Sequence, residues 1–442
     1  MDRRIVLVMH TTSYGASGFA EACTRAGASV AIASDRCHVL DRAWHWPADS
    51  IVIDFTDPER AAAKIAAAAN GAAATGTPVA AVLPVGGEGP AEVAAAAARR
   101  LGLTANAPDA MRAAANKLEM RRRLAAGAGI DRDFRQPRFM TLARDAEPAS
   151  AAAAVAAPDG VGFPCVVKPL ALSGSRGVIR ADDPASFAAA FARLGRLLAT
   201  PAVRHLDPAA ATTILVESFV SGPELALEGL LSSGQLEVLA VFDKPDPLEG
   251  PFFEETLYVT PSLRPAGDQR RIALAVAAAA RDLGIRTGPV HAELRLARDD
   301  FAAPPVVIEV AARSIGGLCA RSMRFDGGLT LEDVVVRHAL GDRVSPRRDP
   351  TPSGVMMLPI PSRVPGVLLS VAGLAEARAI RGIEEVVIST RAGETVTPLP
   401  EGGSYFGFIF ARGTSPDAVT DALRDAAARL RFEIAPLIPV AR

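Results

Sequence analysis

The sequence predicts a multidomain protein of mixed α/β and α+β class. Its 442 residues are too many for a single hydrophobic core, and the usual domain size suggests about three domains. Apolar strand-like and helix-like runs alternate through the first hundred residues, whereas paired strands with short turns follow in the middle of the chain. Hydrophobic residues make up 49% of the sequence, enough to fill several cores without disulfides or metals.

Residues 1–105 are predicted to form a Rossmann-like domain. Continuous apolar segments separated by helices are typical of a parallel sheet covered on both faces, and here they lie at 5–9, 29–34, 50–55 and 78–86, with helices at 19–26, 58–70 and 90–101. The turn at residues 10–18 lacks the GxGxxG pattern, and no acidic residue follows at the required spacing. A nicotinamide site is therefore not expected.

A short strand that carries one lysine runs into a loop of small residues at Phe163–Gly177. Pro169 ends the apolar alternation directly after Lys168, which places this lysine at a strand end. Residues 172–177 include two glycines and two serines, and such a loop can point several backbone N–H groups into one anion-binding concavity. The pattern indicates a polyphosphate clamp, although the chain has no GxxxxGK[ST] motif. The alternative is a hairpin with a solvated lysine.

The segments around this loop are predicted to be helical. Asn116 and Lys117 open a helix, KLEMRRRL, whose arginine-rich face we expect to point to solvent. An alanine-rich helix at about 145–158 precedes the lysine strand, and a helix capped by Asp182-Asp183-Pro184 follows it over 181–198. Residues from about 145 to 216 are therefore interpreted as a small α+β unit that bears the flap.

The central segment is predicted to contain antiparallel strands. One strand at 212–216 ends at Glu217, and two more, at 224–231 and 236–243, are joined by a turn sequence, Ser232-Ser233-Gly234-Gln235. The period of two places Glu224 and Glu228 on one face. Lys244 closes the third strand, a Pro- and Gly-rich loop follows at 246–255, and a helix at 269–283 buries Ile272, Val276 and Leu283.

Two further strands, 290–298 and 305–310, are expected to pair as a hairpin centred near Phe301, with Glu293 opposite Glu309. The same faces carry His291, Arg295, Ala311 and Arg313. Like charges about 5 Å apart repel by roughly 3 kcal/mol at an effective dielectric near 20, so a bound cation would relieve the conflict. Oxygen ligands without a histidine and cysteine cluster favour magnesium over zinc. The alternative is a register slip that turns one glutamate to solvent.

A linker at 345–352 precedes residues that we assign to a C-terminal α+β domain. Strands are expected at 354–358, 384–388 and 405–411, with an N-capped helix at 416–430. This segment offers no obvious catalytic group, so its expected role is packing.

Composition excludes several classes of partner. Lysine and arginine number 48 against 49 acidic residues, and no basic block interleaved with aromatics occurs, so nucleic acid is not expected. Four cysteines, Cys23, Cys37, Cys165 and Cys319, lack metal-ligand spacing and are expected to be buried thiols in a reducing compartment. No apolar run reaches the ~20 residues that span a bilayer, and the five-residue run at the N-terminus is too short for a signal peptide. A cytoplasmic enzyme with small-molecule partners is expected.

The order of these signals resembles the ATP-grasp superfamily over nearly the whole chain. Four stretches are similar to its carboxylate-amine ligases, the L-amino acid ligase-like branch: FDKPDPLEGPFFEETLYVTPS (242–262), GPVHAELRL (288–296), IEVAARSIGG (308–317) and GVLLSVAGLAEARAIRGIEEVVI (366–388). The resemblance implies a Rossmann-like domain at 1–105, an ATP-grasp domain at 106–345 with a flap subdomain at about 145–216, and a C-terminal α+β domain at 346–442. A homodimer is compatible with the family.

The resemblance also implies roles for individual residues. ATP phosphates would be contacted by Lys117, Lys168 and the flap residues Ser173, Gly174, Ser175 and Gly177. Glu217 would accept from the adenine amino group, the Phe219 and Val220 backbone would read the ring edge, and Glu224 would bind the ribose. Glu293 and Glu309 would hold magnesium, as two ions, with manganese an alternative. Arg313 would steady the acyl phosphate, Ser314, Gly316 and Gly317 would hold the carboxylate substrate, and Lys244 and His291 would face the substrate pocket.

The implied reaction is ATP-dependent amide formation between amino acids through an acyl phosphate, with release of ADP and phosphate. Two alternatives stay open: a biotin-carboxylase-like or purine-pathway ATP-grasp enzyme, and a nucleotide-binding module without catalysis. The chain has no Met-Lys-Met biotin site, so a carboxylase would need a separate carrier protein. The second draws on Ala311, which stands where many superfamily members have a metal-binding asparagine. The sequence does not name the carboxylate or the amine.

Overall fold

A computed structural model describes residues 3–437 of the chain except residues 12, 14, 36–48, 75, 128–132, 298–302 and 404. Two features of the sequence analysis, the hairpin centre at Phe301 and the Cys37 thiol, lie outside the described residues. The other three cysteines are buried and free, as expected. No helix within the described ranges is both long and apolar enough to cross a membrane.

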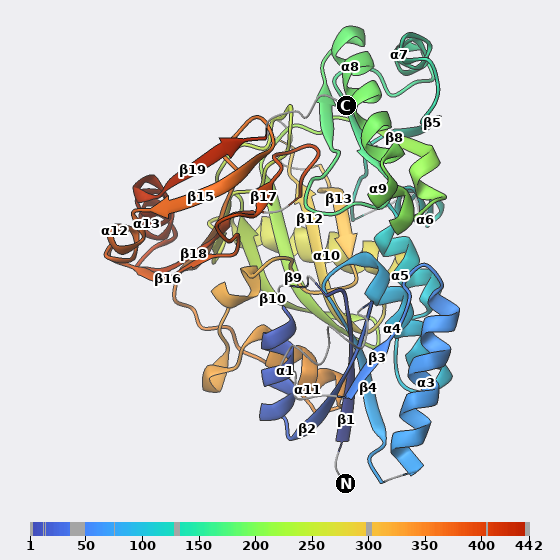
Figure 1. Cartoon of the computed structure of the whole chain (residues 1–442), viewed down its shortest axis with the longest axis vertical. Coiled ribbons are helices and arrows are strands. Elements are labelled where there is room, and N and C mark those ends of the chain that lie inside the picture. Colours follow the sequence, from blue (N-terminus) through green and yellow to red (C-terminus); the bar gives the residue numbers. More distant parts are fainter. Residues whose placement is uncertain are drawn as a thin grey trace.

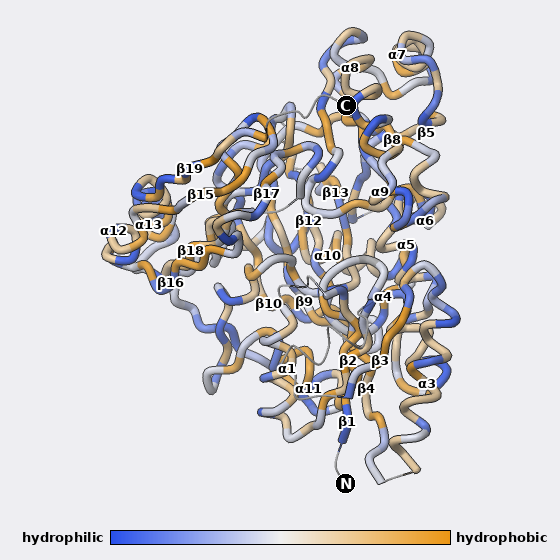
Figure 2. The backbone as a smooth tube through the Cα atoms, viewed as in Figure 1, coloured by the Kyte–Doolittle hydropathy of each residue, from blue (hydrophilic) through white to orange (hydrophobic). Residues whose placement is uncertain are grey.

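The N-terminal residues form the predicted parallel sheet. Its strand order is β3-β2-β1-β4, and its elements are β1 (Arg3–Met9), α1 (Ala16–Arg25), β2 (Ala28–Ser34), β3 (Asp49–Val52), α3 (Pro58–Ala74), β4 (Val79–Val85) and α4 (Glu88–Arg100). Alternate residues of β1 enter different cores, Ile5 and Leu7 on one face and Val6 and Val8 on the other. Burial on both faces explains why these strands are continuously apolar (Figure 2).

The flap-bearing unit contains a four-stranded sheet of order β5-β8-β6-β7. Its elements are β5 (Phe139–Ala143), α7 (Pro148–Ala156), β6 (Cys165–Pro169), β7 (Ile179–Ala181), α8 (Pro184–Ala199), α9 (Pro201–Leu206), a 3-10 turn (Ala210–Thr212) and β8 (Thr213–Ser218). The lysine strand begins at Cys165 and ends at Pro169, as the proline predicted. Two helices lead into this unit, α5 (Pro108–Ala115) and α6 (Lys117–Ala126), and the Asn116 side chain caps α6.

An eight-stranded sheet occupies the centre of the molecule, with the order β13-β12-β9-β10-β11-β14-β18-β16. The strands are β9 (Glu224–Ser232), β10 (Gln235–Asp243), β11 (Leu257–Thr260), β12 (Gly288–Arg295), β13 (Val306–Ala311), β14 (Ser353–Leu358), β16 (Ile383–Ile388) and β18 (Gly407–Arg412). Helix α10 (Ala266–Leu283) buries the predicted Ile272, Val276 and Leu283. Ser233 and Gly234 have φ of 52° and 86°, which is the turn geometry that the β9–β10 hairpin requires.

The C-terminal residues contribute strands to two sheets. β14, β16 and β18 extend the central sheet, whereas β15 (Gly366–Ala372), β17 (Thr395–Val396) and β19 (Arg431–Pro436) form a separate three-stranded sheet. The C-terminal helices are α12 (Leu374–Arg378) and α13 (Pro416–Arg429), whereas α11 (Leu331–Ala339) and two 3-10 turns (Cys319–Ser322 and Asp326–Gly328) lie between β13 and β14. Ser415 caps α13 as predicted. The boundaries 1–105, 106–345 and 346–442 stay predictions.

Figure 1 shows how these parts surround one region. The N-terminal sheet lies at one end of the central sheet, the helices α7 and α8 of the flap unit lie at the other end, and β15, β17 and β19 lie to one side.

Candidate active site

A cavity of about 450 Å³ lies where the N-terminal sheet, the flap unit, the central sheet and the C-terminal segment meet. Its walls include these residues from the sequence analysis: Lys117, Lys168, Ser173, Gly174, Ser175, Glu217, Phe219, Val220, Glu224, His291, Glu293, Glu309, Arg313, Ser314, Gly316 and Gly317. Gly177 and Lys244 are not among the described residues that line it. The sequence analysis therefore identified residues that are far apart in the chain but close in space.

Two lysines lie at one end of the cavity. Lys117, at the first turn of α6, donates from Nζ to the Leu172 carbonyl at 2.9 Å, and its Nζ lies 3.7 Å from Glu309 Oε2. Lys168, from β6, donates to Glu217 Oε2 at 2.7 Å. Both side chains are buried, at 8% and 9% exposure. Two ammonium groups held in a largely dry wall favour an anionic ligand.

The arginine-rich face of α6 points to solvent only in part, because Arg122 is 60% exposed whereas Arg121 faces the interior. Arg121 is fully buried, and its Nε donates to Glu217 Oε1 at 2.7 Å while Nη2 donates to the Ile308 carbonyl at 2.6 Å. The prediction was wrong for Arg121, which stands one helical turn after Lys117 and so shares its inward face, where Glu217 supplies a buried partner.

Glu217 accepts hydrogen bonds from both Arg121 and Lys168. Burial would raise the pKa of Glu217, but the positive charges of Arg121 and Lys168 outweigh burial and lower the pKa to about 2. The carboxylate is therefore ionised at neutral pH, and it fixes the Lys168 ammonium toward the cavity.

The flap adopts backbone conformations that its small residues allow. Gly174, Ser175 and Gly177 have φ of 63°, 55° and 75°, which glycine tolerates and bulky residues do not. A Cβ on Gly177 would come within 2.9 Å of Leu194 Cδ1. The loop from β6 to β7 therefore lies close against α8.

The predicted pairing of the two glutamates is confirmed. Glu293 of β12 is the register partner of Glu309 of β13, and a bulge follows directly after Glu293. Both side chains line the cavity, and Glu309 is 30% exposed. Of the two, Glu309 lies beside Lys117, with its Oε2 3.7 Å from Nζ.

A second ion-pair group lies beside Glu293. Lys244 donates to Glu224, Glu255 and Glu293 at 2.8, 2.7 and 2.7 Å, and the Tyr258 hydroxyl donates to Glu255 at 2.8 Å. Burial would lower the pKa of Lys244, but the three carboxylates raise it well above its usual value. Burial raises the pKa of Glu255 to about 7, against the opposing charge of Lys244. Lys244 therefore lies behind the cavity wall and neutralises a cluster of acids.

His291 is held as a cation. Its Nδ1 lies 3.2 Å from Glu228 Oε2 and its Nε2 lies 3.8 Å from Glu293 Oε1. Burial would lower the pKa of His291, but these two carboxylates raise it to about 9. Glu228 also accepts from the Ile315 backbone N–H at 3.1 Å, which ties the β12 face to the 313–317 loop.

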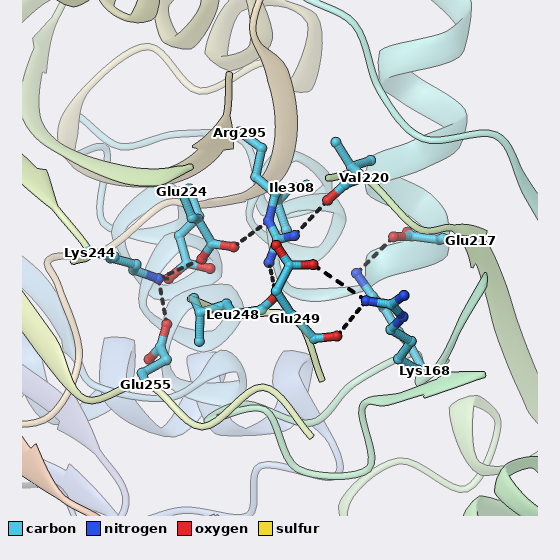
Figure 3. Close-up of polar contacts among 12 residues, drawn as sticks. Lys168, Glu217, Val220, Glu224, Lys244, Leu248, Glu249, Glu255, Arg295 and Ile308 are labelled. Carbon is cyan, nitrogen blue, oxygen red and sulfur yellow. Dashed lines mark hydrogen bonds and ion pairs between the residues drawn. The ribbon is translucent and has the colours of Figure 1, made fainter. Parts of the chain in front are cut away.

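Arginine and phenylalanine side chains form another part of the cavity wall. Figure 3 shows Arg295 between the Lys168–Glu217 pair and the Lys244 group, with Val220 and Leu248 beside it. Arg295 Nε donates to Glu224 Oε2 at 2.8 Å, and its guanidinium lies 5.3 Å from the Phe219 ring centre. Phe219 and Phe253 stack at 6.4 Å. The Arg180 guanidinium lies 4.1 Å from the centre of the same Phe219 ring, so arginine and aromatic side chains pack together along this wall.

The sequence analysis missed four residues that line or support the site: Arg121, Glu255, Tyr258 and Tyr405. The helical spacing of Lys117 and Arg121 could have identified the first. Tyr405 precedes β18 and lines the cavity with Met357 and Phe408, so the C-terminal segment does more than pack. The expectation of a packing role was wrong because strands β14 and β18 join the central sheet.

Two groups of carboxylates around the cavity are candidates for binding a divalent cation, and they differ in how far they are already paired with lysine. Oxygens of Glu224, Glu255 and Glu293 lie within 4.8 Å of one another, but the Lys244 ammonium already bonds to each of them. Glu309 has only the more distant Lys117 as an ion-pair partner in the described structure, and it faces the cavity. Glu309 therefore offers a cation an open carboxylate, the hard oxygen ligand that magnesium prefers, whereas Glu293 shares its Oε1 with Lys244.

Comparisons with known proteins agree with this geometry. Residues 161–322 match the ATP-grasp domain family, and residues 358–435 match L-amino acid ligase C-terminal domain 2. The chain is 25% identical over 341 residues to the uncharacterized protein y4rH of Sinorhizobium fredii, which covers 76% of this chain and 65% of that protein. It is 28% identical over 176 residues to the alanine–anticapsin ligase of Bacillus subtilis, which covers 36% of this chain and 35% of that ligase.

The crystal structure of an L-amino acid ligase from Bacillus licheniformis superposes with a TM-score of 0.77, at 24% identity and with 98% of each chain covered. The fold is therefore shared over the whole length. The chain spans 65% of the first curated relative and 35% of the second, so their activities do not transfer directly.

Proposed function

We propose that this chain, which belongs to the ATP-grasp superfamily and carries an L-amino acid ligase C-terminal domain, is an ATP-dependent ligase that joins two amino acids. The observation that carries the proposal is the convergence of Lys117, Lys168, Glu293, Glu309 and Arg313 on one cavity. Such a set can neutralise a triphosphate beside a carboxylate.

The nucleotide would bind between the flap and the central sheet. Lys117, Lys168 and the backbone of Ser173–Gly177 would contact the phosphates, and the backbone of Phe219 and Val220 would read the edge of the adenine ring. Glu217 would accept from the adenine amino group while orienting Lys168, and Glu224 would bind the ribose. These assignments are supported by the positions of the side chains on the cavity wall.

Glu293 and Glu309 would hold magnesium. The proposal includes two ions at this site and manganese as a substitute for magnesium. Magnesium bound there would spread the charge of the polyphosphate during transfer. With Ala311 two residues after Glu309, the second ion would take a ligand from water or phosphate.

The reaction needs two displacements. An oxygen of the substrate carboxylate attacks the γ-phosphorus of ATP, and ADP leaves. The amine then attacks the carbonyl carbon of the acyl phosphate, phosphate leaves, and the amine loses a proton. Arg313 would stabilise the charge that develops on the acyl oxygens, and Ser314, Gly316 and Gly317 would hold the carboxylate substrate. A closed flap would keep water from the acyl phosphate.

The 358–435 match favours the amino acid ligase over a biotin-carboxylase-like or purine-pathway enzyme. Amino acids supplied in pairs, with ADP release and product mass read together, test the proposal. A pair that yields ADP and a product lighter than its two substrates by one water supports it. Release of ADP only with bicarbonate or formate would favour the alternative enzymes, and nucleotide binding without turnover of any substrate would favour a non-catalytic module.

Replacing Lys168 with methionine should weaken ATP binding about tenfold or more, because the ammonium is lost from a buried wall while Glu217 keeps Arg121 as its partner. Calorimetric titration with ATP measures this. Lys64→Met, at an exposed lysine of α3, serves as the control. Equal affinity in the two variants would show that Lys168 does not contact the nucleotide.

A further inference from the structure

The flap unit is bound to the C-terminal segment by a polar contact that the mechanism above does not use. Arg193 of α8 donates to Glu401 through two parallel hydrogen bonds, Nε to Oε1 at 2.6 Å and Nη2 to Oε2 at 2.8 Å. Both side chains are 38% exposed. A forked arginine–carboxylate pair is directional, so it fixes orientation as well as distance.

Backbone contacts continue from this ion pair to the flap itself. The Gly177 N–H donates to the Pro400 carbonyl at 2.8 Å, and Arg176 Nε donates to the Glu401 carbonyl at 2.7 Å. A Cβ on Gly174 would lie 3.0 Å from the Gly403 carbonyl oxygen, so the two backbones are in close contact. The loop at 398–403 therefore lies directly against the glycine-rich flap.

The contact joins two separately built parts of the molecule. Helix α8 buries Phe187, Phe191 and Leu194 in the core of the flap unit, whereas Val396 and Phe406, on either side of the 398–403 loop, belong to a different core. Neither core depends on the Arg193–Glu401 pair. Partly exposed polar contacts between independent cores can break without unfolding either part.

The same unit also holds the loop that carries Glu255. The Arg180 N–H donates to the Pro251 carbonyl at 2.8 Å, and its Nη1 donates to the Glu249 carbonyl at 2.6 Å. Movement of the flap unit would therefore disturb both the C-terminal loop and the wall of the cavity near Glu255.

We propose that Arg193 and Glu401 form a latch that holds the phosphate flap closed against the C-terminal loop at 398–403. The pair acts through the flap and does not contact the substrates, so both are positioning residues. The inference rests on the proposed function only in placing a nucleotide under the flap. With the latch intact, the flap stays over the bound nucleotide; without it, the nucleotide leaves faster and water reaches the site.

Charge reversal tests the latch. Arg193→Glu and Glu401→Arg each place like charges together, and the double variant restores an opposite pair. Release of a fluorescent ADP analogue, followed by stopped flow in the presence of magnesium and without amino acids, should be about fivefold faster or more in each single variant and should return toward the wild-type rate in the double variant. Arg100→Glu, which breaks the exposed Arg100–Glu59 pair of the N-terminal domain, should leave release unchanged.

A second readout separates the latch from mere loss of stability. Circular dichroism and the unfolding midpoint report whether the variants fold. If a charge-reversal variant fails to fold, Glu401→Gln, which removes the charge but keeps the shape, takes its place. The latch is overturned if release is unchanged in folded single variants or in Glu401→Gln, or if the double variant releases as fast as the singles. A wild-type protein that holds the ADP analogue but ligates no amino acids would contradict the proposed function and leave the latch standing. A wild-type protein that does not bind it would overturn both.

Discussion

The Glu309→Gln variant should lose about a thousandfold or more of ligation turnover while keeping its fold. Glu309 faces the cavity from β13, and its charge is one of the two that the β12–β13 register brings together. Glutamine keeps the volume but removes the anionic ligand, and loss of about 4 kcal/mol of transition-state stabilisation corresponds to that factor. The readout is ADP release under saturating amino acids and magnesium.

A matched control is Glu385→Gln, which removes an exposed carboxylate of β16 that pairs with Arg321. This variant should ligate at nearly the wild-type rate. Because Glu309 is 30% exposed and outside the hydrophobic cores, the unfolding midpoint of Glu309→Gln should stay close to that of the wild type. Turnover of Glu309→Gln at the wild-type rate would remove Glu309 from the metal site.

Arg121→Met should produce the largest loss of stability. Arg121 is fully buried and bonds to both oxygens of Glu217 and to the carbonyls of Val307 and Ile308. Its removal takes two hydrogen bonds from a buried carboxylate and one donor from each of two carbonyls, which should cost about 3–5 kcal/mol of folding free energy. Urea unfolding followed by circular dichroism measures the change.

The neighbouring Arg122→Met is the control, because Arg122 is 60% exposed and its ion pair in the described structure is with Glu119 on the same helix. Its effect should lie within about 0.5 kcal/mol. The double variant Arg121→Met with Glu217→Gln should recover part of the loss, since it removes the unpaired buried charge. Equal stability of Arg121→Met and Arg122→Met would mean that the Arg121–Glu217 pair contributes little to folding free energy.

The sequence predicted the local geometry of the site well. The period of two along β12 and β13, together with a loop of definite length, was enough to place Glu293 opposite Glu309. The proline after Lys168 fixed the end of β6, and the Ser-Ser-Gly-Gln turn fixed the β9–β10 hairpin. Each of these depends on residues a few positions apart, which a single sequence displays directly.

The features that the sequence did not predict depend on contacts between distant segments. Arg121 looks like one arginine among three on a polar helix until Glu217, 96 residues later, is brought against it. Lys244 was expected to face the pocket, yet three carboxylates from separate strands and a loop hold it behind the wall. Tyr405 reaches the cavity because the C-terminal strands extend the central sheet. The periodicity of a short segment carries no information about contacts with residues far away in the chain.

Transfer of oxygen from the carboxylate substrate to phosphate tests the proposed chemistry most directly. When a ligated pair of amino acids is supplied with both oxygens of the attacking carboxylate labelled with oxygen-18, one labelled atom should appear in the released phosphate and one should stay in the amide. Mass spectrometry of phosphate and product measures both. Unlabelled phosphate, or release of AMP and pyrophosphate in its place, would contradict an acyl phosphate formed at this site.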